Sequence, residues 1–432
     1  MGRAVSPAHA ERRSGSAMKI VTGRKIDVAL NKQMNRRILF SADTEKATAR
    51  IVADVRKHGD RALRRYGVKF DGLDRRQPLA VSQQEMSEAL AQVTPEFRRA
   101  LESAAKNIRQ FAEWQKPSPF TREMQPGVTV GQVVRPLESV GCYVPGGRYP
   151  LPSTLLMTAI PAQVAGVPKI TVVSPRPARE TLAAAALLGI GTFYRIGGAQ
   201  AVATLAYGTE TIQPVNKIVG PGNKFVTTAK KLVSFDCGID MIAGPTEALI
   251  ISDDGNAKFI AADLLAQAEH DPDTSVVFVT TSKKLAKQVE EELEKGAKTN
   301  AIAAQSLKAS GLILVADSRE HSIAIANAIA SEHITVPGDY VDEIISAGSI
   351  FVGDYSAQSI GDYASGPNHT LPTGGIARYR GGLSVMDFLK VITVQKVTRD
   401  GLRALAPVVE TLATAEGLKA HAESVRVRRL HA

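Results

Sequence analysis

Cysteine is nearly absent from the 432 residues, since the chain contains only Cys142 and Cys237. Two cysteines support neither a disulfide framework nor a zinc site built from thiolates, so any metal must be bound by histidine, carboxylate or amide groups. A reducing cytoplasm fits this composition. No stretch reaches the roughly 18 uninterrupted apolar residues of a membrane span, because Pro161 and Gln163 interrupt the most apolar region. The N-terminal segment also lacks the apolar core of a secretory signal.

Signals of nucleic-acid binding are missing as well. The net charge is +10, but part of the excess lies at the two ends, for example at Arg12, Arg13, Arg428 and Arg429. Such charge is typical of solvated termini, although it could also attract an anionic ligand such as a dinucleotide. There is no zinc-finger spacing and no aromatic signature of an RNA-binding domain. We therefore expect neither a nucleic-acid partner nor a membrane partner.

Length and periodicity predict the fold. A chain of this length usually forms two or more domains. Residues 44–115 have the apolar spacing of helices, whereas from residue 141 onward short β-branched runs alternate with helical segments in two successive series. This alternation is typical of parallel sheets covered by helices. We predict an α/β protein with two Rossmann-like parallel-sheet domains built on a duplicated plan, plus small helical pieces at both ends.

We divide the chain as follows. Residues 1–17 are expected to be a disordered tail, and residues 18–36 an N-terminal arm. One Rossmann-like domain combines residues 37–140 with 246–381, and the other comprises residues 141–245. Residues 382–432 are expected to form a helical C-terminal tail.

Two glycine-rich turns lie between predicted strands and helices. They are Gly197-Gly198-Ala199-Gln200 and Gly220-Pro221-Gly222-Asn223, and neither has the Gly-x-Gly-x-x-Gly fingerprint of dinucleotide-binding folds. Such turns can present backbone N–H groups at a helix N-terminus, where phosphate binds. They can equally be ordinary tight turns. The spacing alone leaves both interpretations open.

Two segments could supply a metal site and two general bases. Gln267 and His270 are three residues apart in a helix-like run, so they share a face and could offer a metal one amide oxygen and one imidazole nitrogen. Glu332 and His333 precede a strand-like run. Imidazole suits removal of an alcohol proton near neutral pH, and a carboxylate suits activation of water. Each pair alone also fits a helix cap or a surface position.

Two further segments carry polar groups of the same kinds. A turn-rich loop begins with Asp362, a possible metal ligand, and ends with His369, a possible substrate contact. Glu416 and His421 lie five residues apart near the end of the chain. None of these signals is specific by itself, and their combination is what requires an explanation.

The combination resembles histidinol dehydrogenase over residues 19–430. The motifs that carry the resemblance occur in the family's order: Tyr143-Val144-Pro145-Gly146-Gly147, Gly197-Gly198-Ala199-Gln200-Ala201, Gly220-Pro221-Gly222-Asn223, Asp240-Met241 with Ala243-Gly244-Pro245, Gln267-Ala268-Glu269-His270, Glu332-His333, Gly361-Asp362-Tyr363-Ala364-Ser365-Gly366, Asn368-His369 with Leu371-Pro372-Thr373, and Ala415-Glu416 with Ala420-His421. Chance agreement across all of these motifs is not credible.

The resemblance implies an activity and a set of roles. The implied reaction is the oxidation of L-histidinol through L-histidinal to L-histidine with two NAD molecules, the final step of histidine biosynthesis. His333 would take the alcohol proton and Glu332 would activate water. The remaining implied roles are zinc ligation by Gln267, His270, Asp362 and His421, NAD binding by Tyr143, Gln200 and Asn223, and substrate contacts from Thr246, Gln267, His270, His333, Asp362, His369, Glu416 and His421. The last helix would enter the partner's active site in an intertwined homodimer.

Two departures from the family's pattern concern the substrate. Thr246 stands where the family commonly has serine, so the hydroxyl is kept but a methyl group narrows the pocket. Ser331 precedes Glu332 where proline is common. The alternative function is therefore a paralogous NAD-dependent dehydrogenase of another small primary alcohol, for example a sulfonated diol. A zinc-binding or nucleic-acid-binding protein without catalysis is a further class, against which the intact Glu332 and His333 argue.

Overall fold

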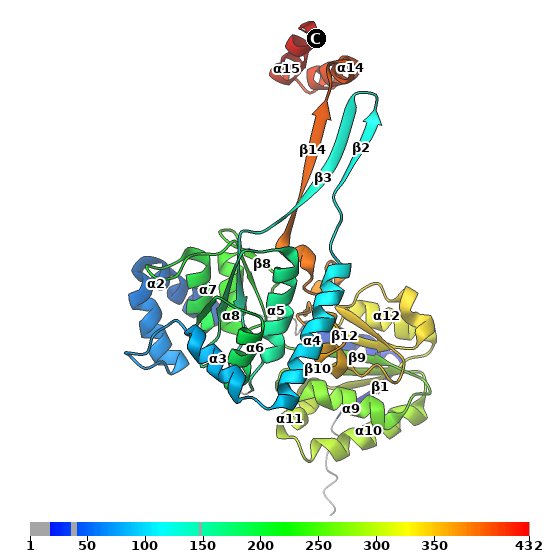
Figure 1. Cartoon of the computed structure of the whole chain (residues 1–432). Helices are drawn as coiled ribbons and strands as arrows, with labels where there is room; N and C mark the ends of the chain where they lie inside the picture. Colours follow the sequence, from blue (N-terminus) through cyan, green and yellow to red (C-terminus); the bar gives the residue numbers. More distant parts are fainter. Residues whose placement is uncertain (1–17, 36–40, 147–148, 432) are drawn as a thin grey trace, which may run out of the picture.

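The computed structural model describes residues 18–35, 41–146 and 149–431. Within them the chain forms two helix-covered parallel sheets and one antiparallel sheet, which projects from the body (Figure 1). The predicted disordered tail lies outside the described residues. No helix in the described ranges is both long enough and apolar enough to cross a membrane.

The six-stranded parallel sheet has the order β1-β11-β10-β9-β12-β13. Its strands are β1 (Lys19–Thr22), β9 (Glu247–Ile251), β10 (Ser275–Thr280), β11 (Leu312–Val315), β12 (His333–Val336) and β13 (Ser349–Val352). Alternate side chains of these strands face opposite sides, as the two-residue period of a strand requires. Helices α9 (Ala257–Ala268), α10 (Lys283–Ala297) and α11 (Ala301–Ser310) cover one apolar face, and α1 (Lys25–Asn35) and α12 (Arg319–Ile329) cover the other. The short helix α13 (Gln358–Tyr363) follows β13.

The five-stranded parallel sheet has the order β6-β5-β4-β7-β8. Its strands are β4 (Ser139–Tyr143), β5 (Lys169–Val173), β6 (Thr192–Tyr194), β7 (Lys217–Val219) and β8 (Gly238–Ile239), and its helices are α5 (Pro152–Ala165), α6 (Arg179–Leu187), α7 (Gly198–Tyr207) and α8 (Lys224–Val233). The two sheets share one strand order. When the strands are numbered by their order along the chain, each sheet contains the order 3-2-1-4-5, as β6-β5-β4-β7-β8 and as β11-β10-β9-β12-β13. This is the Rossmann order without its last strand. The predicted α/β fold with two related parallel sheets is confirmed.

Helices α2 (Ala42–Tyr66), α3 (Gln83–Gln92) and α4 (Pro95–Trp114) pack on the five-stranded sheet. Helix α2 contacts α7 and α8, α3 contacts α6, and α4 contacts α5. Each face of that sheet has an apolar core. Val55 of α2 is part of one core, and Ile108 of α4 is part of the other. This packing differs from the predicted grouping of residues 37–140 with 246–381. The apolar stripe of a helix shows that it packs, but not on which sheet.

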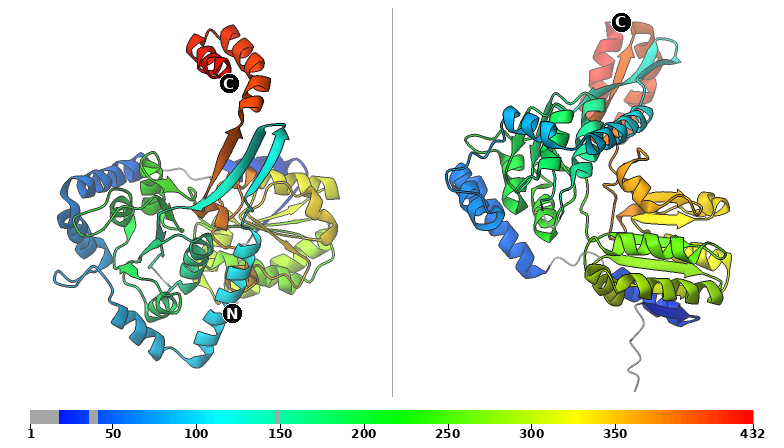
Figure 2. Two further views of the ribbon diagram at one scale, coloured as in Figure 1. Left: turned by 45° about the horizontal axis from the view of Figure 1, so that its top comes forward. Right: turned by 60° about the horizontal axis from the view of Figure 1, so that its bottom comes forward.

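The projecting arm consists of the sheet β14-β3-β2 and two terminal helices. Its elements are β2 (Phe120–Gln125), β3 (Val128–Pro136), β14 (Leu389–Val397), α14 (Arg399–Ala415) and α15 (Lys419–Leu430). All views show it leaving the body (Figure 2). Strand β14 was not expected within the predicted helical tail. The remaining short helices are η1 (Gly67–Asp71), η2 (Gly338–Glu343), η3 (Ile376–Arg378) and η4 (Val385–Phe388).

Candidate active site

Glu332 and His333 lie at the N-terminal edge of the six-stranded sheet, where β12 begins beside β9. Both side chains are buried. One carboxylate oxygen of Glu332, Oε2, accepts a hydrogen bond from the backbone N–H of Glu247 at 3.0 Å. The same oxygen lies 3.8 Å from Nδ1 of His333. The sheet therefore holds a carboxylate and an imidazole side by side in a buried site.

Asp362 connects His333 to Gln267. Its Oδ1 lies 3.2 Å from Nε2 of His333, and its Oδ2 accepts a hydrogen bond of 3.1 Å from Nε2 of Gln267. Because a carboxylate only accepts, the imidazole donates through Nε2–H, and in its neutral form it keeps the lone pair on Nδ1. That Nδ1 is buried and has no hydrogen-bond partner among the described residues. A ring stack on Phe351, with centroids 5.9 Å apart, further fixes the orientation of the imidazole.

Burial and neighbouring charges tune these groups. Burial raises the pKa of Glu332 to about 7, and the nearby His333 only partly opposes this shift. Burial acts to lower the pKa of His333, but the carboxylates of Glu332 and Asp362 outweigh it and hold the pKa above the usual imidazole value. Burial acts to raise the pKa of Asp362, yet the hydrogen bond from His333 keeps it below its ordinary value. The carboxyl group of Glu332 can thus exchange a proton near neutral pH.

The metal ligands that the sequence predicts from this chain's body meet at the same edge of the sheet. Gln267 is buried, and its Oε1 has no hydrogen-bond partner in the described ranges. His270 follows at the exposed end of α9, near enough for its charge to affect the pKa of Asp362. No three histidine, cysteine, aspartate or glutamate side chains of the described chain form a metal cluster. An unsatisfied buried amide oxygen, an imidazole and a carboxylate nevertheless fit zinc, which binds N and O donors.

His369 and Thr246 border this cluster. Nδ1 of His369 lies 2.7 Å from the backbone oxygen of Asp362, and its Nε2 lies 3.4 Å from Oγ1 of Thr154 at the start of α5. Burial lowers the pKa of His369, which favours its neutral form. Thr246 directly precedes Glu247, the residue whose N–H contacts Glu332. The contact between His369 and Thr154 links the Glu332-His333-Asp362 cluster to helix α5 of the five-stranded sheet.

Tyr143, Gln200 and Asn223 lie at the C-terminal edge of that sheet. Tyr143 ends β4, Gln200 lies in the first turn of α7 after β6, and Asn223 precedes α8 after β7. The sheet order reverses between β4 and β7, and ligands of open α/β sheets bind at such a switch point. The three residues therefore border one region of the sheet edge.

Several polar groups of the two glycine-rich turns are bonded within the protein. Gly197 N and Nε2 of Gln200 donate to Oδ2 of Asp71, each at 3.0 Å, and Gly198 N donates to the hydroxyl of Tyr143 at 3.0 Å. The side chain of Asn223 caps α8. The N–H groups of Gly197 and Gly198 are thus already bonded, which favours the ordinary-turn interpretation of the first turn over an open phosphate cradle. Asp71 was missed by the sequence analysis, because nothing near it in the chain marks a partner more than a hundred residues away.

Comparisons with known proteins agree with this architecture. The family model for histidinol dehydrogenase matches residues 34–429. The chain is 47% identical over 402 residues to histidinol dehydrogenase of Vibrio vulnificus, covering 90% of this chain and 93% of that one. It is 44% identical to the enzyme of Aquifex aeolicus, covering 95% of this chain and 100% of that one. A crystal structure of histidinol dehydrogenase from Elizabethkingia anophelis is similar, with a TM-score of 0.91, 39% identity, and coverage of 96% and 98%.

The chain belongs to the histidinol dehydrogenase family. It is therefore an NAD-dependent oxidoreductase.

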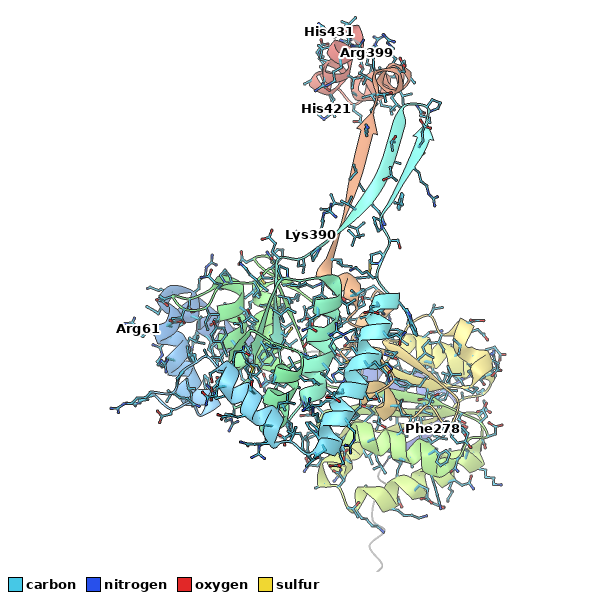
Figure 3. The ribbon with its side chains drawn as sticks, in the orientation of Figure 1. Arg61, Phe278, Lys390, Arg399, His421 and His431 are labelled. Carbon is cyan, nitrogen blue, oxygen red and sulfur yellow. The ribbon has the colours of Figure 1, made fainter. Side chains whose placement is uncertain are left out.

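Two predicted residues of this family member lie away from the cluster. Glu416 and His421 belong to the end of the projecting arm, beyond the full length of β14, and both are exposed. Lys390 marks the root of the arm and His421 its far end, while Phe278 marks the six-stranded sheet in the body (Figure 3). One chain thus brings Gln267, Asp362 and His333 together but leaves His421 outside.

Proposed function

We propose that this member of the histidinol dehydrogenase family oxidises L-histidinol through L-histidinal to L-histidine, reducing two NAD molecules and consuming one water. The observation that carries the proposal is the buried Glu332-His333-Asp362 cluster. It offers an imidazole with a free lone pair beside a carboxyl group whose pKa is about 7. Two bases suit a reaction with two different proton transfers.

The bases take separate steps. Nδ1 of His333 accepts the hydroxyl proton of the alcohol while the carbon-bound hydrogen leaves as hydride to the first NAD. Glu332 then accepts a proton from the water that attacks the aldehyde, and the hydrate passes a second hydride to the second NAD. The acid product releases the third proton. Keeping the aldehyde bound until its own oxidation limits the escape of a reactive intermediate.

The metal proposed for the site is one zinc ion per subunit, held by Gln267, His270, Asp362 and His421 of the partner subunit. When bound, zinc would orient the amino alcohol by binding its nitrogen atoms. Thr246, His369 and Glu416 of the partner subunit are the further proposed substrate contacts. Tyr143, Gln200 and Asn223 are the proposed NAD contacts.

A homodimer with shared active sites is the proposed assembly. Apolar side chains are exposed along β14, with Val391, Ile392 and Val394 each 45–46% exposed. Positions 391 and 392 face opposite sides of the strand, so both faces of the arm are apolar. The helix α14 adds Val408 and Leu412, which are 55% and 59% exposed. A second copy of the chain would cover these groups and receive Glu416 and His421. The two buried free cysteines fit a cytoplasmic setting.

The test is NADH formation by the purified, zinc-loaded protein with L-histidinol and then with other small alcohols. Two NADH per histidinol, histidine as product and loss of activity on chelation are the expected results. Turnover of another alcohol without turnover of histidinol would favour the paralogous dehydrogenase, in which the methyl group of Thr246 narrows the pocket. No turnover with any alcohol would contradict the proposal.

A further inference from the structure

A buried ion pair lies behind the second glycine-rich turn. Lys230 of α8 and Asp240, which follows β8, pair through Nζ and Oδ1. Their side chains are 3% and 0% exposed. Neither residue belongs to the proposed catalytic cluster, the metal ligands or the NAD contacts.

The pair holds both backbone polar groups of Gly220. Oδ2 of Asp240 accepts the N–H of Gly220 at 2.7 Å, and Nζ of Lys230 donates to its carbonyl oxygen at 3.0 Å. Asp240 is itself held, because its Oδ1 accepts the N–H of Met241 and its carbonyl oxygen accepts a hydrogen bond from Arg380. The backbone of Gly220 is therefore fixed from two sides.

Gly220 lies directly against the backbone of Tyr143. Its φ is +116°, and a Cβ at this position would lie 2.1 Å from the carbonyl oxygen of Tyr143. Pro221 follows with a restricted φ, and Asn223 then caps the helix that carries Lys230. Fixing Gly220 consequently sets the position of Asn223 relative to Tyr143.

Stability alone does not account for a pair of this kind. Removing two charges from water costs free energy that their attraction often fails to recover, and well-packed apolar residues are frequently as stable. Here the charged atoms bond to the backbone of one loop residue. We propose that Lys230 and Asp240 are positioning residues for NAD binding, which hold the Gly220–Asn223 loop against Tyr143 so that the dinucleotide meets a preorganised edge. This inference rests on the proposed NAD contacts.

The test compares Lys230→Met with the unchanged enzyme by calorimetric titration with NAD and by steady-state kinetics. We expect the dissociation constant of NAD to rise about tenfold or more, which corresponds to a loss of about 1.4 kcal/mol in binding free energy. The KM for histidinol, the zinc content and kcat at saturating NAD should change little. Asp240→Asn can still accept the hydrogen bond from the N–H of Gly220, so it should raise the dissociation constant of NAD by a smaller factor. This variant replaces Lys230→Met in the test if Lys230→Met does not fold.

Lys217→Met is the matched control. Lys217 begins β7, at the end of the strand opposite to the loop, and its Nζ lies 3.0 Å from Asp387 in another largely buried ion pair. This variant should leave the affinity for NAD unchanged. Unchanged affinity in the variants of the Lys230–Asp240 pair, or an equal loss in the control, would overturn the positioning role.

Asn223→Ala and Gln200→Ala test the proposed NAD contacts separately from the positioning role of Lys230 and Asp240. If they weaken NAD binding while Lys230→Met does not, only the positioning role fails. If they leave NAD binding unchanged, the proposed NAD site is wrong, and the inference fails with it.

Discussion

His333→Gln tests the assignment of the catalytic base with little disturbance of the site. A glutamine amide can reach the position of Nε2 and still donate to Oδ1 of Asp362, which lies 3.2 Å from Nε2 in the unchanged protein. The lost atom, Nδ1, has no hydrogen-bond partner in the described part of the chain, so its removal leaves no other group unsatisfied. The ring stack on Phe351 is lost, at a cost of about 0.5–1.5 kcal/mol in unfolding free energy.

The expected loss of rate is much larger than this loss of stability. A positioned general base contributes about 10²–10⁴-fold to rate. At 1.36 kcal/mol for each factor of ten, the barrier to alcohol oxidation should rise by about 2.7–5.4 kcal/mol. Single-turnover formation of NADH from histidinol measures the chemical step, and calorimetry measures unfolding of the same sample.

The matched control for this variant is His321→Gln, because His321 is a partly exposed residue of α12 outside the cluster. It should leave the rate unchanged. If folded His333→Gln protein retained alcohol oxidation within about tenfold of the unchanged enzyme, the loss would be below the usual contribution of a general base. That result would refute the role of His333.

Four other changes test the remaining roles. Glu332→Gln should slow oxidation of supplied aldehyde roughly 10²-fold and slow alcohol oxidation less, because the amide cannot accept the water proton; equal losses in stopped-flow traces would count against separate roles. Gln267→Leu removes the unsatisfied amide oxygen and should lower the zinc content of folded protein, measured by mass spectrometry, whereas full occupancy would argue against this ligand. Leu412→Asp should convert the dimer to monomers, measured by light scattering, because the dimer would lose the roughly 1.5–3 kcal/mol of free energy that burial of each leucine side chain contributes. An intact dimer would exclude Leu412 from the interface. Mixed dimers of a His421→Ala chain and a His333→Gln chain should regain part of the activity, and no recovery would indicate a site built within one chain.

Local patterns in the sequence predicted the sheets well. The β-branched runs at 275–280 and 312–315 are buried parallel strands, as their composition suggested. Pairing between distant segments was less predictable. Residues 389–397 form a strand because they pair with β3 across more than two hundred intervening residues, which no local signal reveals. The packing partner of α2 was missed for the same reason.

In the candidate site, too, local features were predictable and contacts between distant segments were not. Glu332 and His333 could be found because the two residues are adjacent and precede a strand, and the structure adds Asp362 as their neighbour. The family resemblance supplied the residue roles, which stay predictions. Asp71 and Thr154 could not be inferred, because each acts through a contact made only in the folded chain.

The length of the arm favours a shared site for the proposed zinc ligation. Nine residues of β14 at about 3.3 Å each extend roughly 30 Å. All nine are paired with β3, from Leu389 opposite Pro136 to Val397 opposite Val128. The arm and its terminal helices therefore hold His421 away from Asp362 of its own chain, and one of them would have to move to bring the two residues together. A second copy can present His421 with the arm unchanged, and it would also cover the apolar faces of the arm. Recovery of activity in the mixed dimers is therefore the decisive observation, because a site built within one chain would give none.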